Sequence, residues 1–131
     1  MSNTYTTTGL VATTPRNLIT VEGLSITSFR LASSVKKWNR TSKEWVDETN
    51  WLTITSFEEL ATHTAKSISK GDRVVVSGRL YVRDWDNGER SGTSVELEAE
   101  TIGHDLFYGT SDFVRTTVIG KTSSIEEPII V

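Results

Sequence analysis

The stretch KGDRVVVSGRLYVRDW, residues 70–85, predicts a long β-strand whose two faces differ in character. Side chains alternate sides along a strand. One face is apolar and predicts a core: it holds Val74, Val76, Gly78, Leu80 and Val82. The other face becomes cationic and aromatic toward its far end: it holds Arg73, Val75, Ser77, Arg79, Tyr81, Arg83 and Trp85. A strand that buries one face and presents arginines and rings on the other predicts a β-protein with a ligand-binding outer surface.

A second predicted strand, residues 49–57, repeats this pattern. Leu52 and Ile54 share one face, as core residues do. Trp51 and Phe57 flank threonines on the other face, where a core would carry larger aliphatic side chains. The two strands therefore predict one surface of the same kind.

The rest of the chain predicts an all-β protein with one helix. Threonine, valine and isoleucine are abundant, and turn residues recur between apolar segments. Strands are expected at residues 5–12, 24–37, 49–57, 73–86 and 93–102, with a loop at 38–48. Between residues 57 and 70, apolar residues recur at helical spacing after two glutamates, which favour the start of a helix. This order predicts a small five-stranded barrel or sandwich, with the helix between the third and fourth strands.

Composition limits the class of protein. A chain of 131 residues is about one domain, and the absence of cysteine excludes disulfides and thiolate metal sites. No segment approaches the roughly 20 apolar residues of a membrane span, so we expect a cytoplasmic protein without membrane contact.

The net charge of −3 is unevenly distributed along the chain. Residues 30–90 hold 11 Lys/Arg against 9 Asp/Glu, a balance of +2, whereas residues 91–131 hold 2 against 7, a balance of −5. Glu96, Glu98 and Glu100 fall on one strand parity. This distribution is compatible with a basic binding face and an acidic strand behind it.

Three segments each combine aromatic and basic residues, which is the chemistry of a single-stranded nucleic-acid groove. The third is the predicted loop, where Trp38 has four basic neighbours: Lys36, Lys37, Arg40 and Lys43. Aromatic rings stack on any base, and cations meet the phosphates. Taken singly, each tryptophan would more often be a core or interface residue, and each arginine a solvated edge residue. Their co-occurrence favours nucleic-acid binding.

Five segments, in chain order, also carry a family resemblance: GLVATTP at 9–15, FRLASS at 29–34, ETNWLTITSFEELA at 48–61, SISKGDRVVVSGRLYVRDW at 67–85 and TSVELEAETI at 93–102. Together they resemble the bacterial single-stranded DNA-binding proteins, and the resemblance covers about residues 5–105. It implies an OB-fold, a five-stranded Greek-key barrel, over residues 1–110, followed by a short, partly ordered or disordered tail at 111–131. The short chain and its unusual tail look more like a secondary, actinobacterial-type paralogue than the main replication protein.

The resemblance implies roles for individual residues. The family's base-stacking residues fall on Trp38, Trp51, Phe57 and Trp85. Lys70 and Arg83 match basic contacts of the family. Further DNA-binding candidates, chosen by face or loop, are Lys36, Lys37, Lys43, Arg73, Arg79, Tyr81 and Arg90. Glu58 and Glu59 stand where members often carry a nearby lysine, and Trp45 is open between packing across the loop or on a neighbouring subunit and serving as an added stacking ring.

The expected partners follow from the same resemblance. They are single-stranded DNA, other copies of the chain in a homotetramer or a dimer, and replication or repair proteins that would bind the end SSIEEPIIV, residues 123–131. No cofactor is implied. The process served would be replication, recombination or repair, in the cytoplasm with the nucleoid.

Other classes of function fit the sequence less well. The two histidines, His63 and His104, lack metal-ligand spacing, and no catalytic pattern is present, so the sequence does not predict an enzyme. The main rival is an OB-fold assembly module of a replication-restart complex, in which the tryptophans would lie in a protein interface. An OB-fold that binds a small ligand or an oligosaccharide, and an RNA-binding protein, are further alternatives.

Overall fold

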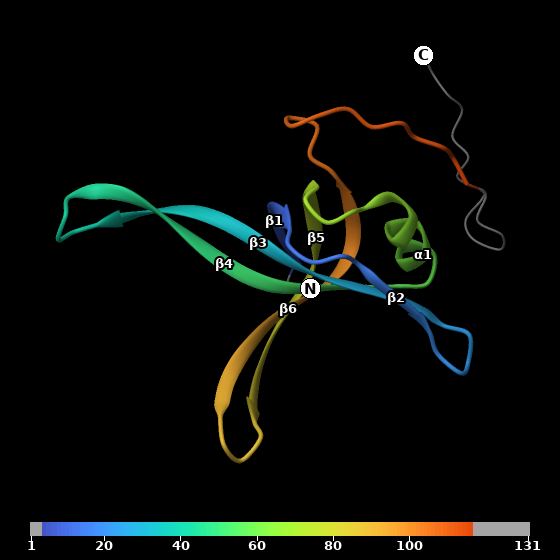
Figure 1. The fold of residues 1–131 in the computed structure, drawn as a ribbon, viewed down its shortest axis with the longest axis horizontal. Helices are drawn as coiled ribbons and strands as arrows, with labels where there is room; N and C mark the ends of the chain where they lie inside the picture. Colours follow the sequence, from blue (N-terminus) through green and yellow to red (C-terminus); the bar gives the residue numbers. More distant parts are fainter. Residues whose placement is uncertain (1–3, 117–131) are drawn as a thin grey trace.

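Six strands and one helix make up the described part of the chain. The structure, a computed structural model, describes residues 4–116 (Figure 1). In chain order the elements are β1 (Thr4–Val11), β2 (Arg16–Ile19), β3 (Ser25–Asn39), β4 (Glu44–Phe57), α1 (Glu58–Ser67), β5 (Arg73–Asp86) and β6 (Ser91–His104). Within residues 4–116, no helix has the length and apolar character needed to cross a membrane.

Five of the strands close into a barrel, as the sequence predicted. The sheet order is β1-β5-β6-β4-β3-β2, and β1 also pairs with β3 through Leu10↔Ala32 and Val11↔Leu31, which closes the ring. The β4–β6 pair is parallel, whereas the other pairs are antiparallel. The helix follows β4, the third barrel strand, so its predicted place is also confirmed.

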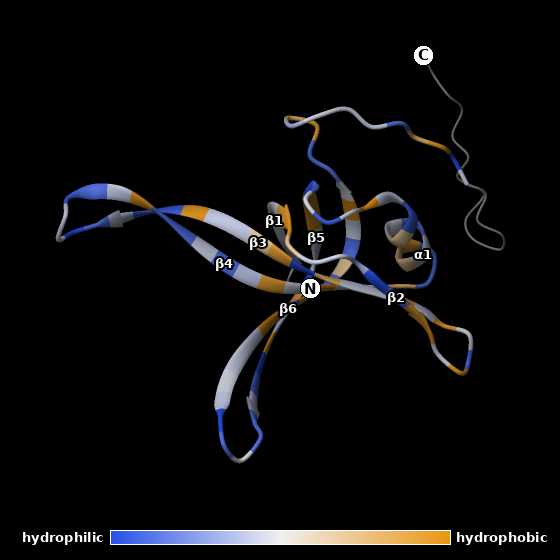
Figure 2. Cartoon of the chain, viewed as in Figure 1, coloured by the Kyte–Doolittle hydropathy of each residue, from blue (hydrophilic) through white to orange (hydrophobic). Residues whose placement is uncertain are grey.

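The core lies inside the barrel, where alternate residues of the barrel strands are buried. Figure 2 shows hydrophobic segments on these strands where they pass through the barrel. Its buried members are Val11, Phe29, Leu31, Leu52, Ile54, Ile68, Val74, Val76, Leu97 and Ala99. The helix packs on this core through half-buried Leu60. The carbonyl oxygen of buried Ala61 accepts a hydrogen bond from the buried Thr27 hydroxyl at 2.7 Å, which ties the helix to β3. The predicted apolar faces of β4 and of the first half of β5 are therefore correct.

Two long hairpins, β3–β4 and β5–β6, extend away from the barrel in different directions (Figure 1). The predicted loop at residues 38–48 is wrong, because β3 continues to Asn39 and β4 begins at Glu44. Val82 was predicted to be a core residue, but it is 63% exposed. This prediction failed because the second half of β5 leaves the barrel, so neither of its faces has a core to pack on.

Side chains in the turns fix the tips of both hairpins. The Asn39 side-chain oxygen accepts hydrogen bonds from the backbone N–H groups of Thr41 and Ser42 at 2.8 and 3.0 Å. At the other tip, the Asn87 side-chain oxygen accepts hydrogen bonds from the backbone N–H groups of Glu89 and Arg90 at 3.0 and 2.8 Å. Asparagine is suited to such turns because its short side chain bonds to the backbone a few residues onward.

Two further features were absent from the sequence prediction. Strand β2 lies between the strands expected at 5–12 and 24–37, where no strand was predicted, and it forms the edge of the sheet beside β3. The β5–β6 ladder shifts register between Ser77 and Gly78, because Ser77 pairs with Thr101 while Gly78 pairs with Ala99. Glu100 is the extra residue of this bulge.

The chain continues beyond β6 without further helix or strand to residue 116. The Asp105 N–H donates a hydrogen bond to the Arg73 carbonyl oxygen at 2.9 Å, which holds the start of this segment against β5. The proposed partner-binding end, residues 123–131, lies outside the described residues.

Candidate nucleic-acid interface

The outward side of the barrel presents one continuous face across four strands. The register places Tyr81 of β5 opposite Glu96 of β6, Glu96 beside Thr53 of β4, and Thr53 opposite Arg30 of β3. The next row, from Arg79 through Glu98 to Thr55, follows the same order. Residues directly opposite each other in a sheet share a face. We call this surface the outer face.

Trp51 lies on the outer face and is 49% exposed. The Arg30 guanidinium carbon lies 5.6 Å from the centre of the Trp51 ring, which is within cation–π distance, and its Nη1 donates a hydrogen bond to Thr53 Oγ1 at 3.1 Å. Sequence reasoning missed Arg30. The signal was present, because Arg30 stands between the inward-facing Phe29 and Leu31 and must therefore point outward.

The β5–β6 hairpin carries the basic and aromatic residues that parity predicted, but acids accompany them. Arg83 Nε lies 3.2 Å from Glu96 Oε1, and the Tyr81 hydroxyl donates a hydrogen bond to Glu98 at 3.4 Å. The Tyr81 hydroxyl raises the pKa of Arg79, whose guanidinium stays charged.

The predicted acidic back of this hairpin is therefore wrong. Leu97 and Ala99 of β6 point into the core, so Glu96 and Glu98 must point outward, beside the arginines of β5. Each carboxylate partly neutralises a neighbouring cation, and the outer face is less positive than the sequence suggested.

Tryptophan 85 lies near the tip of this hairpin, 44% exposed and directly opposite Gly92. Arg83 is opposite Ser94, the next outward residue of β6. From the tip to the barrel, the outward residues of β6 are glycine, serine and two glutamates, so space is greatest where Trp85 lies.

The β3–β4 hairpin carries a pair of tryptophans. Trp38 and Trp45 are directly opposite each other, with ring centres 5.5 Å apart and planes at 64°, an edge-to-face contact. Trp38 is 46% exposed and Trp45 is 63% exposed. Trp45 thus packs across the hairpin, one of the alternatives left open by the sequence, and still presents much of its surface to solvent.

The two lysines of this hairpin point to opposite sides. Lys36 shares the face of Trp38 and Trp51 by register, and its Nζ lies 3.1 Å from Asp47 Oδ1. Lys37 points to the other face, where its Nζ lies 3.6 Å from Glu48 Oε1. The structure therefore separates two residues that the sequence treated as equivalent.

The remaining candidates lie at the ends of the outer face. Phe57 is half-buried at the end of β4, opposite Ile26. Lys43 and Arg90 are exposed in the two hairpin tips, and neither forms an ion pair among residues 4–116. Lys43 adopts a positive φ of 56°.

Lys70 and Arg73 lie at the opposite end of β5 from Trp85. Twelve residue steps separate Arg73 from Trp85, about 40 Å along the strand at roughly 3.3 Å per residue. The Arg73 guanidinium carbon lies 4.8 Å from the centre of the Tyr108 ring, a contact that the sequence did not predict. The structure does not bring these two basic residues together with the tryptophans.

His104 takes part in a structural contact. Its Nε2 lies 3.0 Å from Asp72 Oδ2, which also accepts a hydrogen bond from the Ser69 N–H at 2.9 Å. Partial burial raises the pKa of Asp72, but the bonds from Ser69 and His104 outweigh it, and the pKa lies below its ordinary value. Within residues 4–116, no group of three His, Cys, Asp or Glu side chains is arranged to hold a metal ion.

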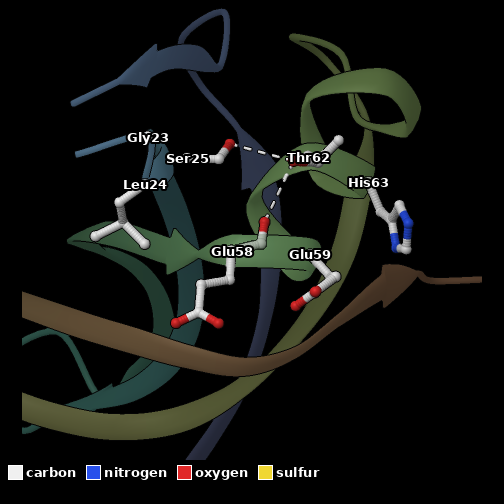
Figure 3. A pocket seen from close by; sticks show the side chains of 7 residues that line it. All are labelled: Gly23, Leu24, Ser25, Glu58, Glu59, Thr62 and His63. Atoms are coloured by element: carbon white, nitrogen blue, oxygen red, sulfur yellow. Dashed lines mark hydrogen bonds between the residues drawn. The ribbon is translucent and has the colours of Figure 1, made fainter. Parts of the chain in front are cut away.

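A shallow pocket of about 340 Å³ lies apart from the tryptophans, between the β2–β3 turn and the start of α1 (Figure 3). The Thr62 hydroxyl lies 3.2 Å from Ser25 Oγ and 3.3 Å from the Glu58 carbonyl oxygen at its floor. Glu58 and Glu59 line it, so the pocket does not suit a phosphate.

Residues 2–105 match the model of the single-strand binding protein family. The chain belongs to this family. The match covers all the candidate DNA-binding residues named above, and it confirms the resemblance found in the sequence.

Relatives of known name are single-stranded DNA-binding proteins as well. Single-stranded DNA-binding protein 2 of Tropheryma whipplei (strain Twist) is 51% identical over 114 residues, which cover 86% of this chain and 75% of the relative. Single-stranded DNA-binding protein 1 of Streptomyces coelicolor is 40% identical over 121 residues, covering 92% and 77%. Both relatives support the actinobacterial character suggested by the sequence.

Solved structures confirm the OB-fold. The crystal structure of a small single-stranded DNA-binding protein from Streptomyces coelicolor superposes with a TM-score of 0.71 at 38% identity, over 82% of this chain and 98% of that one. The second single-stranded DNA-binding protein of Mycobacterium smegmatis gives a TM-score of 0.67 at 27% identity, over 88% and 100%.

Proposed function

We propose that the chain binds single-stranded DNA regardless of sequence, with bases stacked on Trp38, Trp51, Trp85 and Phe57. One observation carries this proposal: three tryptophans are 44 to 49% exposed on the barrel's outer face and the two hairpins, although the core is complete without them. Stacking is worth about 1 to 3 kcal/mol per base and tolerates every base. The family and the names of the relatives support the same ligand.

The charges support two kinds of phosphate contact. Lys43 and Arg90 lie exposed in the hairpin tips without an ion pair to any residue of 4–116, so they can contact a phosphate directly. Lys36 and Arg83 are held by carboxylates across the strand, so they must exchange a carboxylate for a phosphate as DNA binds. The affinity should therefore fall with salt, as for other proteins that neutralise phosphates.

The chain also offers a surface for self-association. Strand β1 pairs with β5 along Thr4–Leu10, but its other edge pairs with β3 only at Leu10 and Val11. An open strand edge can pair with a second copy. A homotetramer, or a dimer, is our proposal, and light scattering coupled to size-exclusion chromatography measures it.

The protein's role in replication, recombination or repair, and its nucleoid-associated place in the cytoplasm, are inferences from the family. Recruitment of replication or repair proteins by the chain's end is a separate proposal, tested by pull-down with a variant truncated after residue 122. We propose no enzymatic activity. The preference for single-stranded DNA over RNA is tested by competition with oligo-rU.

Titration with oligo-dT, followed by intrinsic tryptophan fluorescence at two salt concentrations, tests the proposed function. We expect strong quenching that weakens at higher salt and is absent with duplex DNA of equal length. An unchanged signal at both salt concentrations would contradict stacking and favour the rival assembly module. Trp38, Trp51 and Trp85 would then serve a protein interface.

A further inference from the structure

Gly92 occupies an unusual position for a glycine. The sequence suggested a hairpin turn around this residue, but Gly92 lies inside β6, opposite Trp85. Its φ is not positive, unlike those of Gly23, Gly71 and Gly88, so the backbone does not require glycine there. Glycine weakens a strand interior, and within strands it often marks a close approach of another group.

The approaching group is the Trp85 indole. A Cβ atom added at Gly92 would lie 2.8 Å from Cζ2, 3.0 Å from Cε2 and 3.2 Å from Nε1 of Trp85. These three atoms are consecutive along one edge of the indole, so this edge lies against the Gly92 backbone. The β6 backbone thus limits the indole on this side, while 44% of the residue stays exposed.

The neighbouring side chains leave the space above Gly92 to the Trp85 indole. Arg83, next to Trp85 on the same side of β5, reaches along the hairpin to Glu96, toward the barrel and away from the tip. Ser94 opposite Arg83 is small. No described side chain therefore competes with the indole for the space above Gly92.

We infer that Gly92 is a positioning residue for DNA binding: by lacking a side chain it lets the Trp85 indole lie against the β6 backbone, which holds the exposed ring in place to stack on a base. This inference rests on the proposed stacking role of Trp85. A base that stacks on a ring already held in place orders fewer side-chain rotamers, and preorganisation of this kind raises affinity.

The test replaces Gly92 with alanine and uses Gly103→Ala as the matched control. Gly103 lies in the same strand, also lacks a positive φ, and a Cβ atom there meets nothing within 4 Å. The protein is labelled with fluorotryptophan, and the ¹⁹F resonance of Trp85 is assigned from Trp85→Phe. We expect Gly92→Ala to shift the Trp85 resonance and leave the other tryptophan resonances in place, whereas Gly103→Ala should shift none of them.

Binding to oligo-dT is measured in parallel. Gly92→Ala should weaken binding by about 3- to 10-fold, a part of the roughly 5- to 160-fold loss that corresponds to removing a stacking ring. The slope of log K against log salt should not change, because no charge is altered. The thermal unfolding midpoint should be unchanged or higher, since alanine suits a strand better than glycine, so the loss cannot come from unfolding.

Two results would overturn the inference in distinguishable ways. Parental affinity in Gly92→Ala, together with weakened binding in Trp85→Ala, would show that stacking on Trp85 does not need the contact of the indole with the Gly92 backbone. Parental affinity in Trp85→Ala itself would remove the proposed function of Trp85, and the role of Gly92 with it.

Discussion

Replacing Glu96 with glutamine should strengthen single-stranded DNA binding, although it removes an ion pair. In the free protein Arg83 is held by Glu96 at 3.2 Å, and the two side chains are 67% and 31% exposed. A phosphate that approaches Arg83 must displace this carboxylate and is repelled by it. The substitution keeps the size of the side chain and removes both effects.

The magnitude follows from the exposure of the pair. An exposed ion pair of this kind is worth about 0.2 to 1 kcal/mol. If that energy is no longer lost on binding, the association constant should rise about 1.4- to 5-fold. Arg83 is no longer neutralised before DNA arrives, so the slope of log K against log salt should steepen by up to about 0.7.

The assay is a fluorescence titration with oligo-dT at four or more salt concentrations. Glu22→Gln is the matched control, because it makes the same change in net charge in the β2–β3 turn, away from both long hairpins (Figure 1). It should leave the slope unchanged. Equal gains in both variants would mean that net charge alone is responsible, and weaker binding of Glu96→Gln would refute the competition between carboxylate and phosphate.

Three further predictions concern other residues. Lys36→Ala should weaken DNA binding and reduce the salt slope by at most about 0.7, because Asp47 already neutralises part of its charge, whereas Lys37→Ala, on the opposite face of the hairpin, should leave the slope unchanged in the same titration; equal effects would contradict the register. Trp45→Ala should weaken binding several-fold by releasing Trp38, while Trp45→Phe, which restores an aromatic contact, should retain most of the affinity; equal losses in the two variants would argue against this support. Asp72 has a lowered pKa, so its contribution to stability is present above about pH 4 and is lost as the pH falls through the lowered value; Asp72→Asn should therefore lower the urea midpoint at pH 7 but not at pH 2, and an equal loss at both values would contradict the charge-dependent role.

Where one face of a strand is buried, the sequence was sufficient to predict which side chains face the core. Leu52 and Ile54 flank Thr53. Val74 and Val76 lie on the face opposite Arg73, Ser77 and Arg79, so the side of each strand was predictable. The strand β2 was not, because its four residues are all exposed and show no such alternation.

The hairpins and their charges were harder to predict. Residues 38–48 are polar or exposed on both faces, so nothing in their pattern distinguishes a strand from a loop. The pairing of Arg83 with Glu96 depends on residues 13 positions apart being brought together diagonally across β5 and β6. Only the register of the two strands supplies that information.

The bulge at Gly78 connects the core to the DNA-binding surface. On β6, Leu97 and Ala99 face the core, and strict alternation would then turn Ile102 outward. The extra residue Glu100 changes the alternation, so that Ile102 also packs on the core, opposite the buried Val76. Gly78 is needed at this point because a Cβ atom there would collide with the Glu98 carbonyl.

The same bulge determines what faces Trp85. Beyond it the β5–β6 ladder runs without a further shift to the tip, and this register sets Gly92 opposite Trp85 and Glu96 opposite Tyr81. A ladder one residue out of step would place Thr93 or Ser91 opposite the indole and turn Glu96 to the other side of the hairpin. The position of Trp85 over Gly92 and the charge balance of Arg83 therefore both depend on a single extra residue, Glu100, which lies 8 positions from Gly92 and 4 from Glu96 at the edge of the core.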